Sequence, residues 1–238
     1  PGRLALVCLL LLLGFGTARS QPIRPHVYVV PIEGVIDLGL APFLARVLAE
    51  ATASGAAAVI LDINTLGGRV DAAVAIRDTL LAAKTPTVAF INRRAISAGA
   101  LIALATDRIA MAEGSTIGAA MPVEIGGVGG TPQPVGEKTV SYVRKEFRAT
   151  AEARKRPPLL AEAMVDSDVE IPGVIEKGKL LTLTTDEAMA LKLSDLRAAT
   201  CPRCCGRWTS PTPRSAASPQ AGPKPWSASS PTPQSARC

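Results

Sequence analysis

The sequence predicts an α/β fold in which helices cover a parallel β-sheet, and two observations carry that prediction. Short aliphatic runs alternate with longer segments whose apolar residues recur at helical spacing, which is the pattern of βαβ units. Hydrophobic residues make up 47% of the 238 residues and aromatic residues only 3%. The core must therefore be built from Ala, Val, Leu and Ile, as in the buried strands of a parallel sheet.

The expected elements follow one another along the chain. Short aliphatic runs between turn residues predict strands at 27–32, 57–63, 87–91, 108–112 and 180–183. Apolar residues at helical spacing predict helices at 41–54, 70–83, 98–105, 139–156, 159–165 and 185–191. Residues 33–36 are interpreted as a turn. Residues 114–136, rich in Gly, Pro and small residues, are interpreted as a long loop, and such loops are usually functional or mobile.

The two ends of the chain differ in composition from the body between them. Residues 1–20 contain an early arginine, an apolar run and a small-x-small site, which together predict a secretory signal peptide, with an uncleaved anchor as the alternative. Residues 21–196 form the predicted folded domain. Residues 197–238 hold no acidic residue and are dominated by Pro, Ser, Ala, Arg and Thr, so we expect a disordered tail, for which a frameshift is one explanation.

Charge and cysteine usage exclude several classes of function. The net charge of +6 comes largely from the two ends, and no basic stripe with interleaved aromatics appears, so no nucleic acid is expected as a partner. Cysteines are confined to the signal and the tail, which excludes a disulfide or thiol chemistry in the domain. The tail cysteines Cys201, Cys204 and Cys205 lack a second pair of ligands, so neither a metal nor a cofactor is expected.

Ser97 is the candidate nucleophile. It lies among small residues between the strand expected at 87–91 and the helix expected at 98–105. A turn at such a junction exposes a hydroxyl above the sheet edge, and the first N–H groups of the helix are free to face a developing negative charge. The alternative is that Ser97 is only the N-cap of the helix. These residues alone leave both interpretations open.

The number of histidines in the chain limits which residue can act as the general base for such a serine. The chain has one histidine, His26, and it precedes the first expected strand, so a Ser-His-Asp triad is not expected. Lys138 follows the long loop, and a lysine amine can take a hydroxyl proton if it is desolvated and neutral near pH 7. The paired glycines Gly67 and Gly68 follow a buried strand and let the backbone turn its N–H groups toward a carbonyl oxygen; an ordinary βα turn is the alternative.

A resemblance makes these features more specific. The segments 61–71, 97–100, 105–111 and 114–119, in this order and spacing, resemble the NfeD family of membrane-bound serine proteases of the ClpP class. The resemblance covers about residues 27–195 and implies a ClpP/crotonase-like spiral of β-β-α units. It implies a dyad of Ser97 and Lys138, with the N–H groups of Gly68 and Ala98 forming the oxyanion hole. It also implies cleavage of hydrophobic peptides, often from a stomatin-like membrane partner.

Two residues of this chain, Ala120 and Leu66, differ from those found at the matching positions of related proteases. Ala120 lies in the segment where ClpP proteases place a catalytic histidine, which agrees with a lysine base. Leu66 stands where the family usually has proline, so the turn before Gly67 loses a stiffening residue.

We therefore expect an exported, envelope- or membrane-associated serine endopeptidase whose domain lies on the non-cytoplasmic side. Gly67, Gly118 and Ala119 are expected to contact the peptide substrate. A homo-oligomer is expected, with a dimer favoured. Two alternatives stay open: a non-catalytic scaffold that binds a stomatin-like partner, and a crotonase-like acyl-CoA enzyme, whose fold shares the oxyanion hole.

Overall fold

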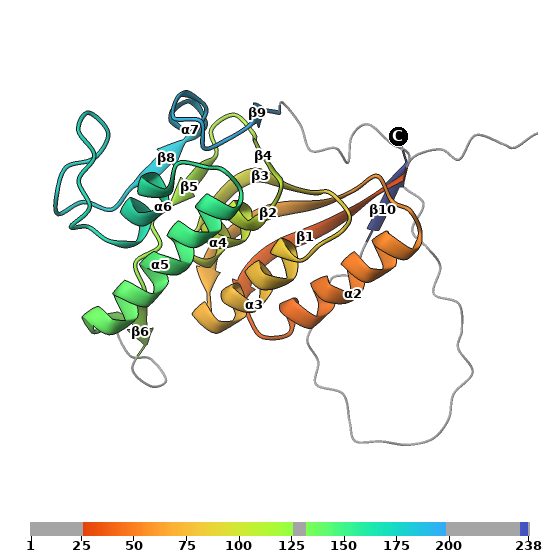
Figure 1. Cartoon of the computed structure of the whole chain (residues 1–238), viewed down its shortest axis with the longest axis horizontal. Coiled ribbons are helices and arrows are strands. Elements are labelled where there is room, and N and C mark those ends of the chain that lie inside the picture. Colours follow the sequence, from red (N-terminus) through yellow and green to blue (C-terminus); the bar gives the residue numbers. More distant parts are fainter. Residues whose placement is uncertain (1–25, 126–131, 199–233, 238) are drawn as a thin grey trace, which may run out of the picture.

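A mixed β-sheet organises the structure, a computed structural model that describes residues 26–125, 132–198 and 234–237 (Figure 1). Its central strands run parallel in the order β1 (His26–Ile36), β2 (Ala58–Gly68), β3 (Thr87–Ile96), β4 (Arg108–Met111) and β9 (Leu196–Arg197). The short strand β5 (Thr116–Gly118) runs parallel to the end of β3 and pairs antiparallel with β8 (Thr182–Thr184). A separate hairpin joins β6 (Val123–Ile125) and β7 (Pro132–Pro134).

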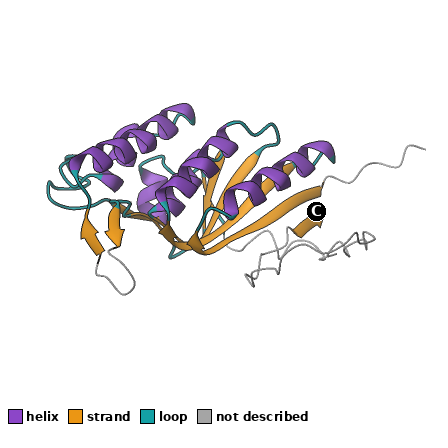
Figure 2. Ribbon diagram, turned by 90° about the horizontal axis from the view of Figure 1, so that it is seen from below, coloured by secondary structure: helices purple, strands orange, loops and turns teal. Residues whose placement is uncertain are grey.

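The helices gather over one face of this sheet, as Figure 2 shows. They are α2 (Leu40–Ala53), α3 (Val70–Leu81), α4 (Ala98–Ala105), α5 (Glu137–Ala153), α6 (Pro158–Val165) and α7 (Thr185–Ala190). The main core lies between this layer and the sheet and consists mostly of aliphatic side chains and alanine. All eight residues of α4 are buried, so this helix lies at the centre of the layer. The opposite face of the sheet carries a smaller cluster that includes Phe90.

All six expected helices are present, with ends that differ by at most three residues, but the first three strands are longer than expected. The interpretation of residues 33–36 as a turn is wrong. A bulge at Gly34, whose φ is +73°, lets β1 continue to Ile36, which is fully buried and pairs with Gly68. The extension carries the end of β2 into the sheet and holds the paired glycines at its edge.

The interpretation of residues 114–136 as a loop without strands is also wrong. This segment contains β5, β6 and β7, each of three residues. Strands of this length are too short to show a period of two in the sequence. β5 matters most, because it occupies the place beside the last residues of β3 and ends next to Ser97.

Part of the expected disordered tail is described as a strand. β10 (Gln234–Arg237) pairs antiparallel with the first residues of β1. The reason is that β1 is otherwise an edge strand, whose free N–H and C=O groups accept an extended segment. The expected signal peptide at 1–20 and the cysteines at 201, 204 and 205 lie outside the described residues.

The parallel arrangement places the candidate site. Because β1, β2 and β3 run in the same direction, their carboxyl ends meet at one edge of the sheet, where α/β folds bind ligands. Gly67 and Gly68 end β2 at this edge, and Ser97 follows β3 there.

Candidate active site

Ser97 occupies a strained turn between a strand and a helix. β3 ends at Ile96 and α4 begins at Ala98, and Ser97 between them has φ 55° and ψ −119°. Side chains other than glycine rarely adopt this backbone conformation, and it costs on the order of 1–3 kcal/mol. Its N–H donates to the carbonyl of Gly118 at 3.0 Å, which ties the turn to β5.

The side chain of Ser97 does not cap the helix that it precedes. Although Ser97 is at the N-cap position of α4, its hydroxyl makes no capping hydrogen bond. The residue is half-buried and lines a pocket. A hydroxyl in a strained turn that does no capping is available for chemistry, since strain of this kind is concentrated at functional sites.

Gly67 lies directly against Ser97. Its φ of +114° is a conformation that favours glycine, and a β-carbon built there would lie 2.7 Å from Cβ of Ser97 and 3.1 Å from its Oγ. The backbone of Gly67 therefore lies close to the candidate nucleophile, with no room for a side chain between them.

Gly68 and Ala98, whose N–H groups are expected to form the oxyanion hole, line the same pocket as Ser97. The N–H of Gly67 donates to Oγ1 of Thr65 at 3.0 Å, and that of Arg69 donates to the carbonyl of Ile36 at 2.8 Å. Gly68 lies between these two residues at the end of β2. Ala98 is the first residue of α4, so its N–H has no acceptor within the helix. Gly68, Ser97 and Ala98 line one pocket, where two such donors could stabilise an oxyanion.

The pocket beside Ser97 is small and apolar. Its walls come from α3, α4, α5 and the segment after β5, and the apolar residues that line it are Val70, Ala73, Ala98, Leu101, Ala120, Pro122, Val143 and Phe147. Sequence reasoning assigned no site role to the α5 residues Val143 and Phe147, which are 4% and 2% exposed. The apolar face of the expected helix was the available signal, but it does not tell which neighbour that face contacts.

Lys138 lies in the first turn of α5, the helix that contributes Val143 and Phe147 to the lining of this pocket. Its side chain is exposed, and no hydrogen bond or ion pair to it occurs in the described part of the chain. The structure therefore brings the helix of Lys138 to Ser97, but it does not place the amine within hydrogen-bond reach of the hydroxyl.

Gly118 and Ala119 support the turn and do not line the pocket. The carbonyl of Gly118 accepts the N–H of Ser97, and the N–H of Ala119 donates to the carbonyl of Leu181 at 2.9 Å. A β-carbon on Gly118 would lie 2.4 Å from the same Leu181 oxygen. This packing fixes β5 between Ser97 and β8.

His26 lies far from this site. His26 is the first residue of β1, and its Nε2 is 3.1 Å from Oγ of Ser54. The site lies beyond Ile36, at the other end of β1. Ten residues of extended strand span about 33 Å. The single histidine therefore cannot serve Ser97, in agreement with the sequence.

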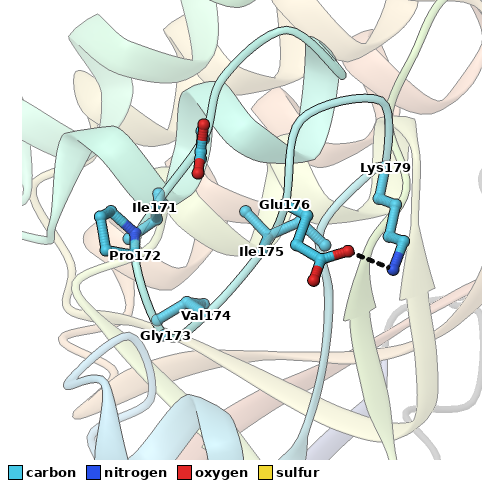
Figure 3. A pocket seen from close by; sticks show the side chains of 8 residues that line it. Ile171, Pro172, Gly173, Val174, Ile175, Glu176 and Lys179 are labelled. Atoms are coloured by element: carbon cyan, nitrogen blue, oxygen red, sulfur yellow. Dashed lines mark hydrogen bonds and ion pairs between the residues drawn. The ribbon is translucent and has the colours of Figure 1, made fainter.

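A second hollow lies in the segment between α6 and β8 (Figure 3). It has a volume of about 400 Å³ and is lined by Glu170, Ile171, Pro172, Gly173, Val174, Ile175, Glu176 and Lys179. Lys179 pairs with Glu176 at 2.7 Å, and the lining contains no hydroxyl or thiol nucleophile. This hollow shares no residue with the pocket at Ser97. Within the described residues, no group of three or more His, Cys, Asp or Glu side chains could hold a metal ion.

Comparison with known proteins identifies the family. Residues 26–202 match the family described as NfeD1b, N-terminal domain. The chain belongs to this family. The sequence-based assignment to NfeD proteins is thereby confirmed.

Two relatives extend beyond the region that they share with this chain. Membrane protein NfeD1b of Bacillus subtilis is 38% identical over 190 residues, which cover 79% of this chain and 42% of the relative. Membrane-bound protease PH1510 of Pyrococcus horikoshii is 30% identical over 148 residues, which cover 61% of this chain and 34% of the relative. The matched regions thus span about two fifths and one third of these relatives. In the described ranges, no helix combines the length and hydropathy needed to cross a membrane.

Solved structures confirm the fold. One similar structure is that of the 1510-N membrane-bound stomatin-specific protease, a lysine-to-alanine mutant in complex with a substrate peptide. It superposes with a TM-score of 0.66 at 27% sequence identity, and the match covers 75% of this chain and 77% of the other. ClpP1 from Listeria monocytogenes matches with a TM-score of 0.54 at 19% identity, over 73% of this chain and 92% of the other. The chain therefore has the ClpP-like fold that the motifs predicted.

Proposed function

We propose that this chain is a serine endopeptidase in which Ser97 is the nucleophile. The observation that carries the proposal is the strained turn of Ser97, which presents an uncapped hydroxyl beside Gly67 and the N–H groups of Gly68 and Ala98. Homology to a membrane-bound protease supports the same reaction class. Acyl transfer requires a hydroxyl that is free to attack and donors that stabilise the oxyanion.

The proposed reaction proceeds through an acyl-enzyme. Oγ of Ser97 attacks the scissile carbonyl carbon, and the carbonyl oxygen becomes an oxyanion held by the N–H groups of Gly68 and Ala98. Lys138, in its neutral form, accepts the hydroxyl proton and returns it to the leaving amine as the peptide bond breaks. Water then hydrolyses the acyl-enzyme, and the Lys138 amine again acts as the base.

Three observations support Lys138 as the base. No histidine lies near Ser97. α5, which carries Lys138, forms part of the pocket wall through Val143 and Phe147. Its amine has no ion-pair partner in the described part of the chain that would have to be displaced. Catalytic hydrogen bonds often form only when substrate is bound, so an open distance in the free protein is compatible with this role.

We also propose a hydrophobic peptide segment as the substrate. The apolar lining of the pocket beside Ser97 favours an apolar side chain next to the scissile bond. Its volume of about 20 Å³ means that its walls must move apart to admit that side chain. Because one structural relative is described as stomatin-specific, a stomatin-like membrane protein is the proposed source of that segment. In this proposal residues 21–196 are the protease domain, exported behind a signal at 1–20, associated with a membrane or envelope, and homo-oligomeric with a dimer favoured.

Fluorophosphonate labelling combined with peptide cleavage tests the proposal. The full chain is expected to be labelled at Ser97 and to cleave an apolar peptide, and Ser97→Ala is expected to lose both activities. Ser54→Ala is the matched control, because Ser54 forms the Ser–His contact described above but lacks paired N–H donors. Lys138→Ala is expected to lower cleavage by several orders of magnitude, since residues of a dyad act as a unit.

Two outcomes would contradict the proposal. Labelling that survives Ser97→Ala would assign the nucleophile elsewhere. Peptide binding by a wild-type chain that is neither labelled nor able to cleave would instead support a scaffold.

A further inference from the structure

Thr65 joins the two halves of the candidate active site. It is a β2 residue that is only 3% exposed, two positions before Gly67. Its hydroxyl accepts the N–H of Gly67 at 3.0 Å and donates to the carbonyl of Gly34 at 2.5 Å. Its methyl group faces α4, where a β-carbon on Gly99 would lie 2.5 Å from Cγ2.

We propose that Thr65 is the positioning residue of the oxyanion hole, an inference that rests on the proposed function. Its hydroxyl fixes the turn that presents the N–H of Gly68. Its methyl sets the separation between that turn and the start of α4, which presents the N–H of Ala98.

The hydroxyl is needed because the backbone around it is unusually free. Gly34 and Gly67 both have positive φ, at +73° and +114°, and glycine is the residue with the most conformational freedom. Leu66 between Thr65 and Gly67 is 70% exposed, so burial does not anchor it. It also lacks the fixed φ that a proline would give there. The hydrogen bonds of the Thr65 hydroxyl supply the rigidity that the backbone does not.

The methyl is needed because it is the β2 atom nearest to the β-carbon position of Gly99, in the first turn of α4. Thr65 pairs with Ala95 in the register of β2 and β3, two residues before Ser97. The hydroxyl and the methyl are bonded to the same tetrahedral Cβ, and the few χ1 rotamers of a β-branched side chain fix both directions relative to the backbone. One side chain therefore sets the position of both donors.

The first experiment separates the hydroxyl from the methyl. Thr65→Val is expected to lower kcat for peptide cleavage by about tenfold to a hundredfold with little change in KM, because a misplaced oxyanion donor affects mainly the transition state. Thr65→Ser keeps the hydroxyl but loses the methyl, so it is expected to retain more of kcat than Thr65→Val but less than the wild type. A wild-type kcat in Thr65→Val would overturn the proposal.

Thr106→Val is the matched control for stability. Thr106 is fully buried, and its hydroxyl contacts the carbonyls of Ala103 and Arg108, each at 2.8 Å, at the opposite end of α4 from Ser97. This variant also removes a buried hydroxyl, so its Tm is expected to fall about as far as that of Thr65→Val, while kcat stays at the wild-type level. An equal loss of kcat in both variants would mean that Thr65 is merely structural.

The second experiment uses the contact with Gly99. Gly99→Ala forces its β-carbon against Cγ2 of Thr65 and is expected to lower kcat, whereas its other neighbours, beyond 3.7 Å, leave room. Combining Gly99→Ala with Thr65→Ser removes Cγ2, so the double variant is expected to recover kcat. Failure to recover would show that the methyl does not set this separation.

A third readout does not depend on catalysis. Hydrogen exchange at the Gly67 N–H is expected to be about tenfold faster in Thr65→Val than in the wild type or Thr65→Ser, since one protecting hydrogen bond is lost. If the wild type neither cleaves nor labels, the proposed function fails, while this exchange still decides the role of Thr65. Unchanged exchange in Thr65→Val would refute the proposed positioning.

Discussion

Gly67 packs so closely against Ser97 that no side chain fits between them: a β-carbon on Gly67 would lie 2.7 Å from Cβ of Ser97. Both residues have positive φ, at +114° and +55°. The end of β2 and the turn before α4 are thus fitted to each other, and the position of the hydroxyl depends on the absence of a side chain one strand away.

Gly67→Ala is therefore expected to abolish labelling and cleavage. The new methyl must displace Ser97, and the positive φ adds strain, so the free energy of unfolding should fall by about 2–5 kcal/mol. Activity assays and thermal unfolding measure the two effects. Gly173→Ala is the control, because Gly173 has φ +75° but nothing within 4 Å of its β-carbon position. A Gly67→Ala variant as active as Gly173→Ala would contradict the packing argument.

Phe147→Leu is expected to widen the specificity of cleavage. Phe147 is 2% exposed and helps to line the pocket at Ser97, so a smaller side chain should admit a larger residue of the peptide. The ratio of kcat/KM for a peptide with a large apolar residue to that for a small one should rise by about tenfold. Phe90→Leu is the control, since Phe90 is equally buried in the cluster on the opposite face of the sheet. An unchanged ratio in Phe147→Leu would remove this pocket from substrate recognition.

The positions of Ser97 and Gly67 could be predicted because strand, turn and helix signals are local in sequence. An aliphatic run followed by small residues marks the junction at Ser97, and paired glycines mark the end of β2. Both lie at the carboxyl edge of a parallel sheet, so their proximity follows from the fold class.

The remaining parts of the site depend on tertiary contacts that no local pattern encodes. β5 is three residues long and shows no periodicity, yet Gly118 at its end binds the N–H of Ser97. The apolar face of α5 was visible in the sequence, but the place of Phe147 in the wall of the pocket at Ser97 was not. Thr65 resembles any strand threonine until its hydrogen bonds are seen.

Arg156, in the segment between α5 and α6, binds the far end of α4, the helix that follows Ser97. It is 6% exposed, and its guanidinium donates to the carbonyls of Leu104 at 3.2 Å and Thr106 at 3.0 Å. Arg156→Met leaves these acceptors and its partner Asp195 without that donor, so the free energy of unfolding should fall by about 2–4 kcal/mol. Urea unfolding measures this change. Arg46→Met, at an exposed arginine, should stay within about 0.5 kcal/mol of the wild type. Equal stability of the two variants would refute the anchoring role of Arg156.

Asp195 is expected to make part of the stability pH-dependent. Burial alone would raise its pKa, but the N–H of Ile109 at 2.8 Å and the guanidinium groups of Arg108 and Arg156 outweigh burial, so the pKa is lowered in the folded state. A carboxyl group whose pKa is lower in the folded state than in the unfolded state stabilises the fold. This stabilisation is complete above the unfolded-state pKa, about 4 for aspartate, and is lost as the pH falls through the folded-state pKa.

Asp195→Asn should therefore be less stable than the wild type at pH 7, and the difference should shrink as the pH is lowered from about 4 toward 2. Urea unfolding across this range measures the difference. Asp168→Asn controls for the loss of one negative charge, since Asp168 is exposed and its ion-pair partner is Lys177 at 3.7 Å. The difference in the free energy of unfolding between Asp195→Asn and the wild type could instead stay constant down to pH 2. That result would mean that the asparagine disrupts packing and that the charge of Asp195 does not stabilise the junction of β4 with β9.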